Sequence, residues 1–248
     1  MATQFNEMTR VQFPGLIHLI KLGYDFIPRS EVENIKDPEN NILTPVLKKQ
    51  FFKLNSDATE KEFDDEYKEI KAELTNNDLG KEFFDRIQNK GNSKFKFIDW
   101  DNWNNNVFQV SYEIPCKNGD DEFRPDLTIF INGLPLAYIE FKKPNAIRDG
   151  QTGMTSEFTR MEKRFKNKSF KVFHNITQVI GFTDNMEYSE DYGMHTTGSY
   201  YCTSSYTKAF FNSMHEERVE EVSKAVGEIS EVKVEEFLKD ANKIAIKD

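Results

Sequence analysis

The sequence predicts an α/β fold, and three features of its 248 residues support this class. Two apolar segments of strand length, 127–131 and 134–141, flank Asn132-Gly133, a dipeptide typical of a tight β-hairpin. Helical patterns stand before and after this hairpin, and a further strand-like segment follows the second of them. The order of helix, strand, hairpin, helix and strand therefore indicates a sheet covered by helices.

The N-terminal third is predicted to be mainly helical. Residues 4–24 have an apolar stripe that ends at Gly23, although Pro14 breaks or restarts this helix. Pro45 is placed to begin a second helix in its first turn. Residues 57–90 are acidic and helical, with one narrow apolar face formed by Phe63, Tyr67, Ile70 and Leu74.

The other elements lie around and after the hairpin. Residues 107–114 alternate as a strand before it, and residues 157–168 form an amphipathic helix after it. A strand is expected at 175–182, followed by a polar segment rich in Tyr and Ser. Residues 207–239 return to a helical pattern.

The composition indicates a folded protein in a reducing compartment. Hydrophobic residues make up 38% and aromatic residues 13%, which is enough for a sizeable core. The sequence contains neither a signal peptide nor an apolar run of membrane-spanning length, so no membrane partner is expected. Cys116 and Cys202 are far apart and form no disulfide-rich or metal-binding pattern. A cytoplasmic location is the simplest expectation.

The hairpin carries the groups needed to hydrolyse a phosphodiester. Asp126 starts the first strand, and Glu140 and Lys142 lie two residues apart near the end of the second. Because side chains alternate along a strand, Glu140 and Lys142 project from the same face. Two carboxylates can hold a divalent ion that activates water, and a lysine can orient that water or steady the developing charge. This spacing alone is unspecific, and an ordinary salt bridge of Lys142 is the alternative explanation.

The apolar pattern of the hairpin predicts its register. With a loop of Asn132-Gly133 alone, Asp126 would lie opposite Ile139 and share the face of the core. A loop of Ile131-Asn132-Gly133, with Gly133 left-handed, pairs Asp126 with Tyr138 instead. We therefore predict an odd-length loop, with the acids and the lysine converging on the concave face of the sheet. The apolar residues that then point into the core are Leu127, Ile129, Ile139 and Phe141.

The segment RPDLTIFINGLPLAYIEFKKP, residues 124–144, closely resembles the nuclease-domain hairpin of the R (restriction and motor) subunit of type I restriction endonucleases. That domain belongs to the PD-(D/E)xK nuclease superfamily. The likeness extends over residues 5–215, through Leu22-Gly23-Tyr24 near the start and the segment 173–184 downstream. It implies a PD-(D/E)xK restriction-endonuclease-like core, a mixed β-sheet flanked by helices, with helical additions at both ends.

The resemblance also implies a domain division and a set of site residues. Residues 1–215 form the nuclease domain, and residues 216–248 form a helical segment leading toward a motor domain that this sequence lacks. Asp126 and Glu140 become ligands of Mg²⁺, for which Mn²⁺ can substitute, and the Phe141 backbone carbonyl is expected to join them. Lys142 becomes the catalytic lysine. Related nucleases often place an acid on the first helix, where Glu7 is the candidate; an exposed glutamate at a helix start is the alternative.

Basic residues after the catalytic strand are the candidates for DNA contacts, namely Lys143, Arg160, Lys163 and Arg164. These nucleases usually carry a Gln-x-x-x-Tyr element on the helix after the lysine. Here that helix reads Arg160 to Phe165, with no Gln and with Phe where Tyr is expected. Either the basic helix replaces the element, or this chain binds DNA differently.

The charge balance bears on how DNA reaches the site. The formal net charge is −9, whereas a protein that holds DNA by itself usually presents a basic face. We therefore expect other domains and subunits to deliver double-stranded DNA, and the resemblance implies methyltransferase and specificity subunits as partners. The sequence has no G-x-x-x-x-G-K-[ST] loop, so ATP is expected to act only through the missing motor.

The resulting expectation is a Mg²⁺-dependent endonuclease domain that cuts unmodified double-stranded DNA after ATP-driven translocation. The alternative is a catalytically silent docking module that links the motor to the methyltransferase core. The complete set of Asp126, Glu140 and Lys142 argues against that alternative. A self-sufficient nuclease such as a junction resolvase predicts a strongly basic chain, and this chain is acidic.

Overall fold

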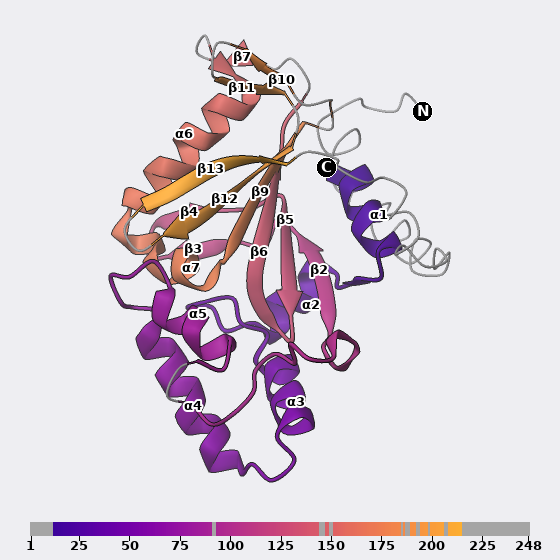
Figure 1. Ribbon diagram of the computed structural model, residues 1–248, viewed down its shortest axis with the longest axis vertical. Coiled ribbons are helices and arrows are strands. Elements are labelled where there is room, and N and C mark those ends of the chain that lie inside the picture. The colour runs from indigo at the N-terminus through magenta and orange to yellow at the C-terminus, as the bar shows by residue number, and fades with distance from the viewer. Residues whose placement is uncertain are drawn as a thin grey trace.

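A computed structural model of the chain describes residues 12–214 except 91–92, 144–146, 149–150, 185, 187–188, 192–193, 198 and 206–207. Its centre is a seven-stranded sheet in the order β1-β2-β5-β6-β9-β12-β13 (Figure 1). β1 pairs with β2 and β6 with β9 in parallel, and the other neighbours are antiparallel. The predicted α/β class with a mixed sheet is confirmed. The strands are β1 (Asp25–Phe26), β2 (Phe108–Tyr112), β5 (Leu127–Ile131), β6 (Leu134–Phe141), β9 (Val179–Thr183), β12 (Ser199–Ser205) and β13 (Lys208–Met214).

Helices flank this sheet, and short two-stranded ribbons lie beside it (Figure 1). The helices are α1 (Phe13–Lys21), α2 (Arg29–Ile35), α3 (Thr44–Leu54), α4 (Glu60–Glu73), α5 (Lys81–Ile87), α6 (Gly153–Lys166) and α7 (Lys171–Ile176). The ribbons are β3 (Cys116–Asn118) with β4 (Asp121–Phe123), β7 (Ile147–Arg148) with β8 (Gln151–Thr152), and β10 (Ser189–Asp191) with β11 (Met194–Thr197). Within the ranges given above, no helix has the length and apolar character needed to cross a bilayer.

The central strand β6 is covered on both faces. On one face, Leu127 and Phe141 pack against Leu16 and Ile20 of α1. On the other face, Tyr138 packs with Met161 of α6 and with residues of α7 and β9. Burial on both faces explains why β6 is apolar along most of its length, as is usual for a strand with a parallel neighbour.

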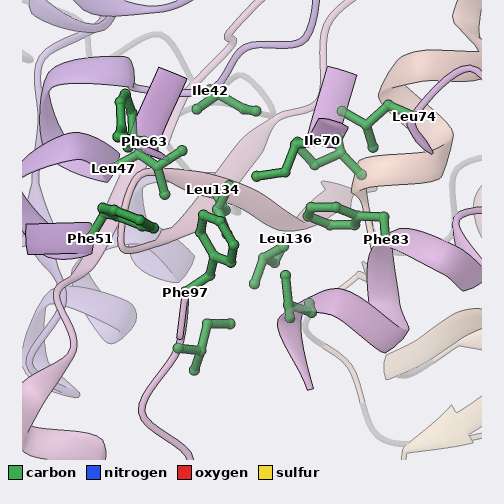
Figure 2. Packing of buried hydrophobic residues seen from close by; sticks show 13 residues of the cluster. Ile42, Leu47, Phe51, Phe63, Ile70, Leu74, Phe83, Phe97, Leu134 and Leu136 are labelled. Atoms are coloured by element: carbon green, nitrogen blue, oxygen red, sulfur yellow. The ribbon is translucent and has the colours of Figure 1, made fainter. Parts of the chain in front are cut away.

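The turn end of the hairpin is held by α3, α4 and α5. Leu134 and Leu136 of β6 lie among Phe51, Phe83 and Phe97, all of them almost completely buried (Figure 2). Gly133, with a φ of 84°, lies directly against α3, because a Cβ there would come within 2.8 Å of the Leu43 carbonyl oxygen. Only glycine satisfies both conditions, so this turn fixes where α3 docks.

The predicted odd-length loop is wrong, but the apolar face that it was meant to explain is confirmed. Asn132 and Gly133 have φ of 52° and 84°, the pattern of a two-residue type I′ turn. The register then shifts between Ile129 and Phe130, so that Leu136 is an extra residue in β6. A bulge thus supplies the odd residue that we assigned to the loop.

The bulge sets the pairing near the candidate site. Leu127 pairs with Ile139, so the next residues along the two strands, Asp126 and Glu140, are neighbours. Asp126 is therefore beside Glu140 and not beside Tyr138. The apolar residues on the α1 side of the hairpin are Leu127, Ile129, Ile139 and Phe141, as predicted.

Two other predictions of secondary structure need correction. The helix predicted at 207–239 is wrong at its start, because residues 208–214 form β13, which pairs with β12 along its whole length. The polar segment before it contains β10, β11 and β12. Pairing with a neighbouring strand decides these segments, and periodicity within one segment does not reveal it. The predicted helical segment 216–248 lies outside the described residues, as do residues 1–11.

Two boundaries also moved. The acidic helix predicted at 57–90 is two helices, because Gly80, with a φ of 77°, begins a new one at α5. The strand predicted at 175–182 begins at Val179, and α7 occupies the residues before it. Phe173 and Ile176 of α7 are both buried and lie three residues apart, the spacing of one helical face.

Candidate active site

Glu140 lies near the end of β6 and faces α6. Its side chain is only 1% exposed. An Arg164 guanidinium nitrogen of α6 lies 2.6 Å from the Glu140 carboxylate, and an Arg160 nitrogen lies 3.7 Å from it. Burial and the nearby charge of Glu157 raise the pKa of Glu140, while Arg164 opposes this shift. Glu140 is thus a buried carboxylate whose charge depends on α6.

Lys142 follows β6 directly and continues its ladder with β9, since its backbone N–H donates to the Thr183 carbonyl at 2.9 Å. Its ammonium lies 3.1 Å from a carboxylate oxygen of Glu157 on α6. Glu157 is 2% exposed, and Arg160 contacts both of its oxygens, at 2.8 and 2.6 Å. The lysine therefore shares its partner with an arginine of the same helix.

Asp126 directly precedes β5, at the same corner of the sheet. One carboxylate oxygen accepts a hydrogen bond from the Gln12 side-chain amide at 2.7 Å. The other accepts from the backbone N–H of Phe141 at 2.6 Å. Because Phe141 separates Glu140 from Lys142 in sequence, this bond ties Asp126 to the end of β6.

The three predicted catalytic residues thus lie close in the fold but have separate partners. Asp126 is bonded to Gln12 and Phe141, Glu140 to arginines of α6, and Lys142 to Glu157. The sequence analysis missed Glu157. Its spacing to Arg160 and Arg164 is three and seven residues, which places all of them on one face of a helix. That spacing was the available signal.

The chemistry of the donor set fits a magnesium ion. The carboxylates of Asp126 and Glu140 and the Phe141 carbonyl are hard oxygen donors, which Mg²⁺ prefers. In the part of the chain that the structure describes, no group of three or more His, Cys, Asp or Glu side chains is placed to hold a metal. Two carboxylates completed by water and phosphate are nevertheless a usual magnesium site. Glu140 would exchange Arg164 for the ion.

The predicted DNA contacts fall into two groups. Lys143 and Lys163 are exposed, and the Arg160 side chain is 42% exposed although it is paired. The Arg164 side chain is 11% exposed and points to Glu140, in the buried cluster instead of the surface. Glu7 lies outside the described residues.

Comparisons with known proteins agree on one family. A family model described as the N terminus of type I restriction enzyme R proteins (HSDR_N) matches residues 4–210. The putative type I restriction enzyme MjaIXP endonuclease subunit of Methanocaldococcus jannaschii is 28% identical over 207 residues, 75% of this chain and 19% of that protein. The putative MjaVIIIP endonuclease subunit of the same organism is 29% identical over 188 residues, 71% of this chain and 18% of that protein. This chain thus spans under a fifth of the length of either relative.

Proposed function

Because the chain belongs to the family of type I restriction enzyme R protein N termini, we propose that it is the nuclease domain of such an R subunit. The observation that carries this proposal is the hydrogen bond from the Phe141 N–H, between Glu140 and Lys142 in sequence, to the Asp126 carboxylate, which joins the start of the hairpin to the end of β6. A hairpin, a crossover through α6 and a parallel strand β9 surround this junction, in keeping with a PD-(D/E)xK core. The names of the two relatives, endonuclease subunits, point the same way.

The site residues would divide the work of hydrolysis. Asp126, Glu140 and the Phe141 carbonyl would hold Mg²⁺, or Mn²⁺ in its place. The bound ion supplies charge neutralisation at the phosphate and a water of lowered pKa. Lys142 places a cation beside the developing negative charge. The bond from Phe141 N–H fixes the Asp126 carboxylate at the end of β6, and Glu140 would exchange Arg164 for the ion.

The substrate we propose is unmodified double-stranded DNA, delivered by ATP-driven translocation. The motor, and the methyltransferase and specificity subunits, lie outside this chain. The net charge of −9 supports such delivery, because it disfavours independent capture of a polyanion. The exposed Lys143, Lys163 and Arg160 are the groups proposed to meet the phosphates.

One observation favours a second candidate, the catalytically silent docking module. Both Glu140 and Lys142 are engaged in ion pairs with α6, which is also how a purely structural cluster would look. The two functions differ in what happens when Lys142 is removed.

The test is Lys142→Ala in the complete subunit, assembled with its partners and supplied with Mg²⁺, ATP and unmodified DNA. We expect cleavage to fall about a hundredfold or more, because a cation at the developing charge is lost. ATP hydrolysis and translocation should be unchanged. The matched control is Lys61→Ala, an exposed lysine of α4, and this helix lies at the opposite end of the molecule from α6 (Figure 1). Unaltered cleavage by Lys142→Ala would favour the docking module.

A further inference from the structure

The helix α6 presents three charged side chains to the end of β6. Glu157, Arg160 and Arg164 all contact residues of this cluster. Together with Glu140 and Lys142 they make two acids and three bases. This is the helix on which the sequence lacks Gln-x-x-x-Tyr, and of its charged face only Arg160 has a role proposed above.

Glu157 is the least exposed charge that α6 contributes. Its side chain is 2% exposed, compared with 11% for Arg164 and 42% for Arg160. A buried carboxylate loses its hydration, so its partners must compensate for that loss. Arg160 contributes contacts at 2.8 and 2.6 Å, and Arg164 lies 3.7 Å away. The arginines of α6 therefore already balance the charge of Glu157.

The contact with Lys142 is thus additional, and it crosses from the helix to the sheet. A lysine side chain has a flexible four-carbon stem and loses rotamer freedom when it is fixed. Lys142 is only 19% exposed, and its ammonium lies 3.1 Å from Glu157. A fixed ammonium matters for catalysis, because a misplacement of about 1 Å can cost a hundredfold in rate.

We propose that Glu157 is a positioning residue, whose buried carboxylate holds the Lys142 ammonium at the site of phosphodiester cleavage. The inference rests on the proposed nuclease function and adds a residue to it. Arg160 and Arg164 anchor Glu157 from its own helix, so the rigid body of α6 determines where Lys142 points. In this arrangement the acid does not touch the substrate and acts through the lysine.

A purely structural role for Glu157 predicts a different pattern of losses. If Glu157 only joined α6 to the sheet, its removal would lower the stability of the fold, and cleavage would fall in proportion to the loss of folded protein. If it positions Lys142, removal lowers the cleavage rate at saturating DNA and leaves the half-saturating DNA concentration unchanged. Restoring a carboxylate one methylene shorter should recover part of the rate.

The experiment compares Glu157→Gln, Glu157→Asp and the control Glu162→Gln, an exposed acid on the same helix. Each is made in the complete subunit with its partners, and cleavage, translocation and thermal unfolding are measured. We expect Glu157→Gln to cleave about a hundredfold more slowly, with unchanged translocation and DNA half-saturation. Glu157→Asp should cleave about tenfold faster than Glu157→Gln, because the charge is restored. Glu162→Gln should match the unaltered protein.

The outcomes separate this inference from the function on which it rests. If Lys142→Ala abolishes cleavage while Glu157→Gln equals Glu162→Gln, the positioning role is wrong and the nuclease stands. If Lys142→Ala cleaves normally, both fail. Should Glu157→Gln not fold, the charge-retaining Glu157→Asp decides: a folded variant that cleaves at the unaltered rate overturns the proposal, and a roughly tenfold loss supports it.

Discussion

His174 illustrates how burial governs a single residue. It is 4% exposed, and its ring stacks on Phe165 at 4.2 Å and on Phe123 at 5.7 Å between centroids. Burial among these rings lowers the pKa of His174 to about 4, from an ordinary value of 6.5. Phe165 is the residue that stands where a tyrosine was expected, and here it packs inward instead of facing DNA.

The depressed pKa of His174 makes stability depend on pH. Between pH 6.5 and about 4 the unfolded chain binds a proton that the folded chain does not, so stability is lost as the pH falls. The free energy of unfolding should fall between pH 7 and pH 5, and we expect this fall to be about 2 kcal/mol smaller in His174→Phe than in the unaltered chain. Urea unfolding at both pH values measures this difference. The control is the same substitution at the exposed His18. Equal pH dependence in the unaltered chain and in both variants would contradict the prediction.

At the scale of residues, the sequence predicted correctly which face of the strand a side chain occupies, because side chains alternate along a strand. The shared face of Glu140 and Lys142 follows from strand geometry alone. The partners of these residues could not be derived in the same way, because Glu157 and Arg164 reach them from a helix whose rotation depends on Met161 and the rest of the core. Gln12, which bonds to Asp126, is 114 residues away in sequence.

At the scale of elements, α4 and α5 are joined by a buried ion pair. Arg86 of α5 donates to Glu73 of α4 at 2.6 and 2.8 Å and also contacts Glu66. Burial raises the pKa of Glu73, although Arg86 opposes this effect. Glu73 therefore depends on Arg86 to remain charged in the folded chain.

The loss of stability on removing Arg86 should distinguish this buried pair from exposed surface pairs. We expect Arg86→Met to lower the free energy of unfolding by about 3 kcal/mol, because a buried carboxylate loses its partner. The control Lys81→Met breaks the exposed pair of Lys81 with Asp85 on the same helix and should cost less than about 1 kcal/mol. Chemical unfolding of the two variants measures both values, and similar losses would refute the distinction.

Elements were predictable where local chemistry decides them. The place of the turn and the two strands beside it follow from residue preferences, although the length of the loop was predicted wrongly. The bulge at Leu136 was not predictable, because Leu134 and Leu136 pack into a core made by α3, α4 and α5, which are distant in sequence (Figure 2). β12 and β13 were missed for a related reason, because each is stabilised by its neighbour in the sheet.

At the scale of the whole molecule, charge and sheet order act together. The order β5-β6-β9 places the candidate site at the end of central strands, beside a helix that carries exposed basic residues. Many other cations are paired with acids: Lys48, Lys94 and Arg86 pair with acids of α4, and Lys71 of α4 pairs with Glu39. The basic surface beside the site is therefore local, within a chain of net charge −9.

This distribution predicts how the chain behaves alone with DNA. Few phosphate contacts and an acidic remainder should leave a Kd for duplex DNA near the weak end of nonspecific binding, about 10⁻⁴ M at physiological salt. Anisotropy of a labelled duplex, titrated at several salt concentrations, measures it; Lys163→Ala should weaken binding further and reduce the salt slope by about one. Because the chain alone binds DNA weakly, it should cleave far more slowly than the complete subunit. Tight binding that is insensitive to salt would mean that this domain captures DNA itself, which would remove the need for delivery by a motor.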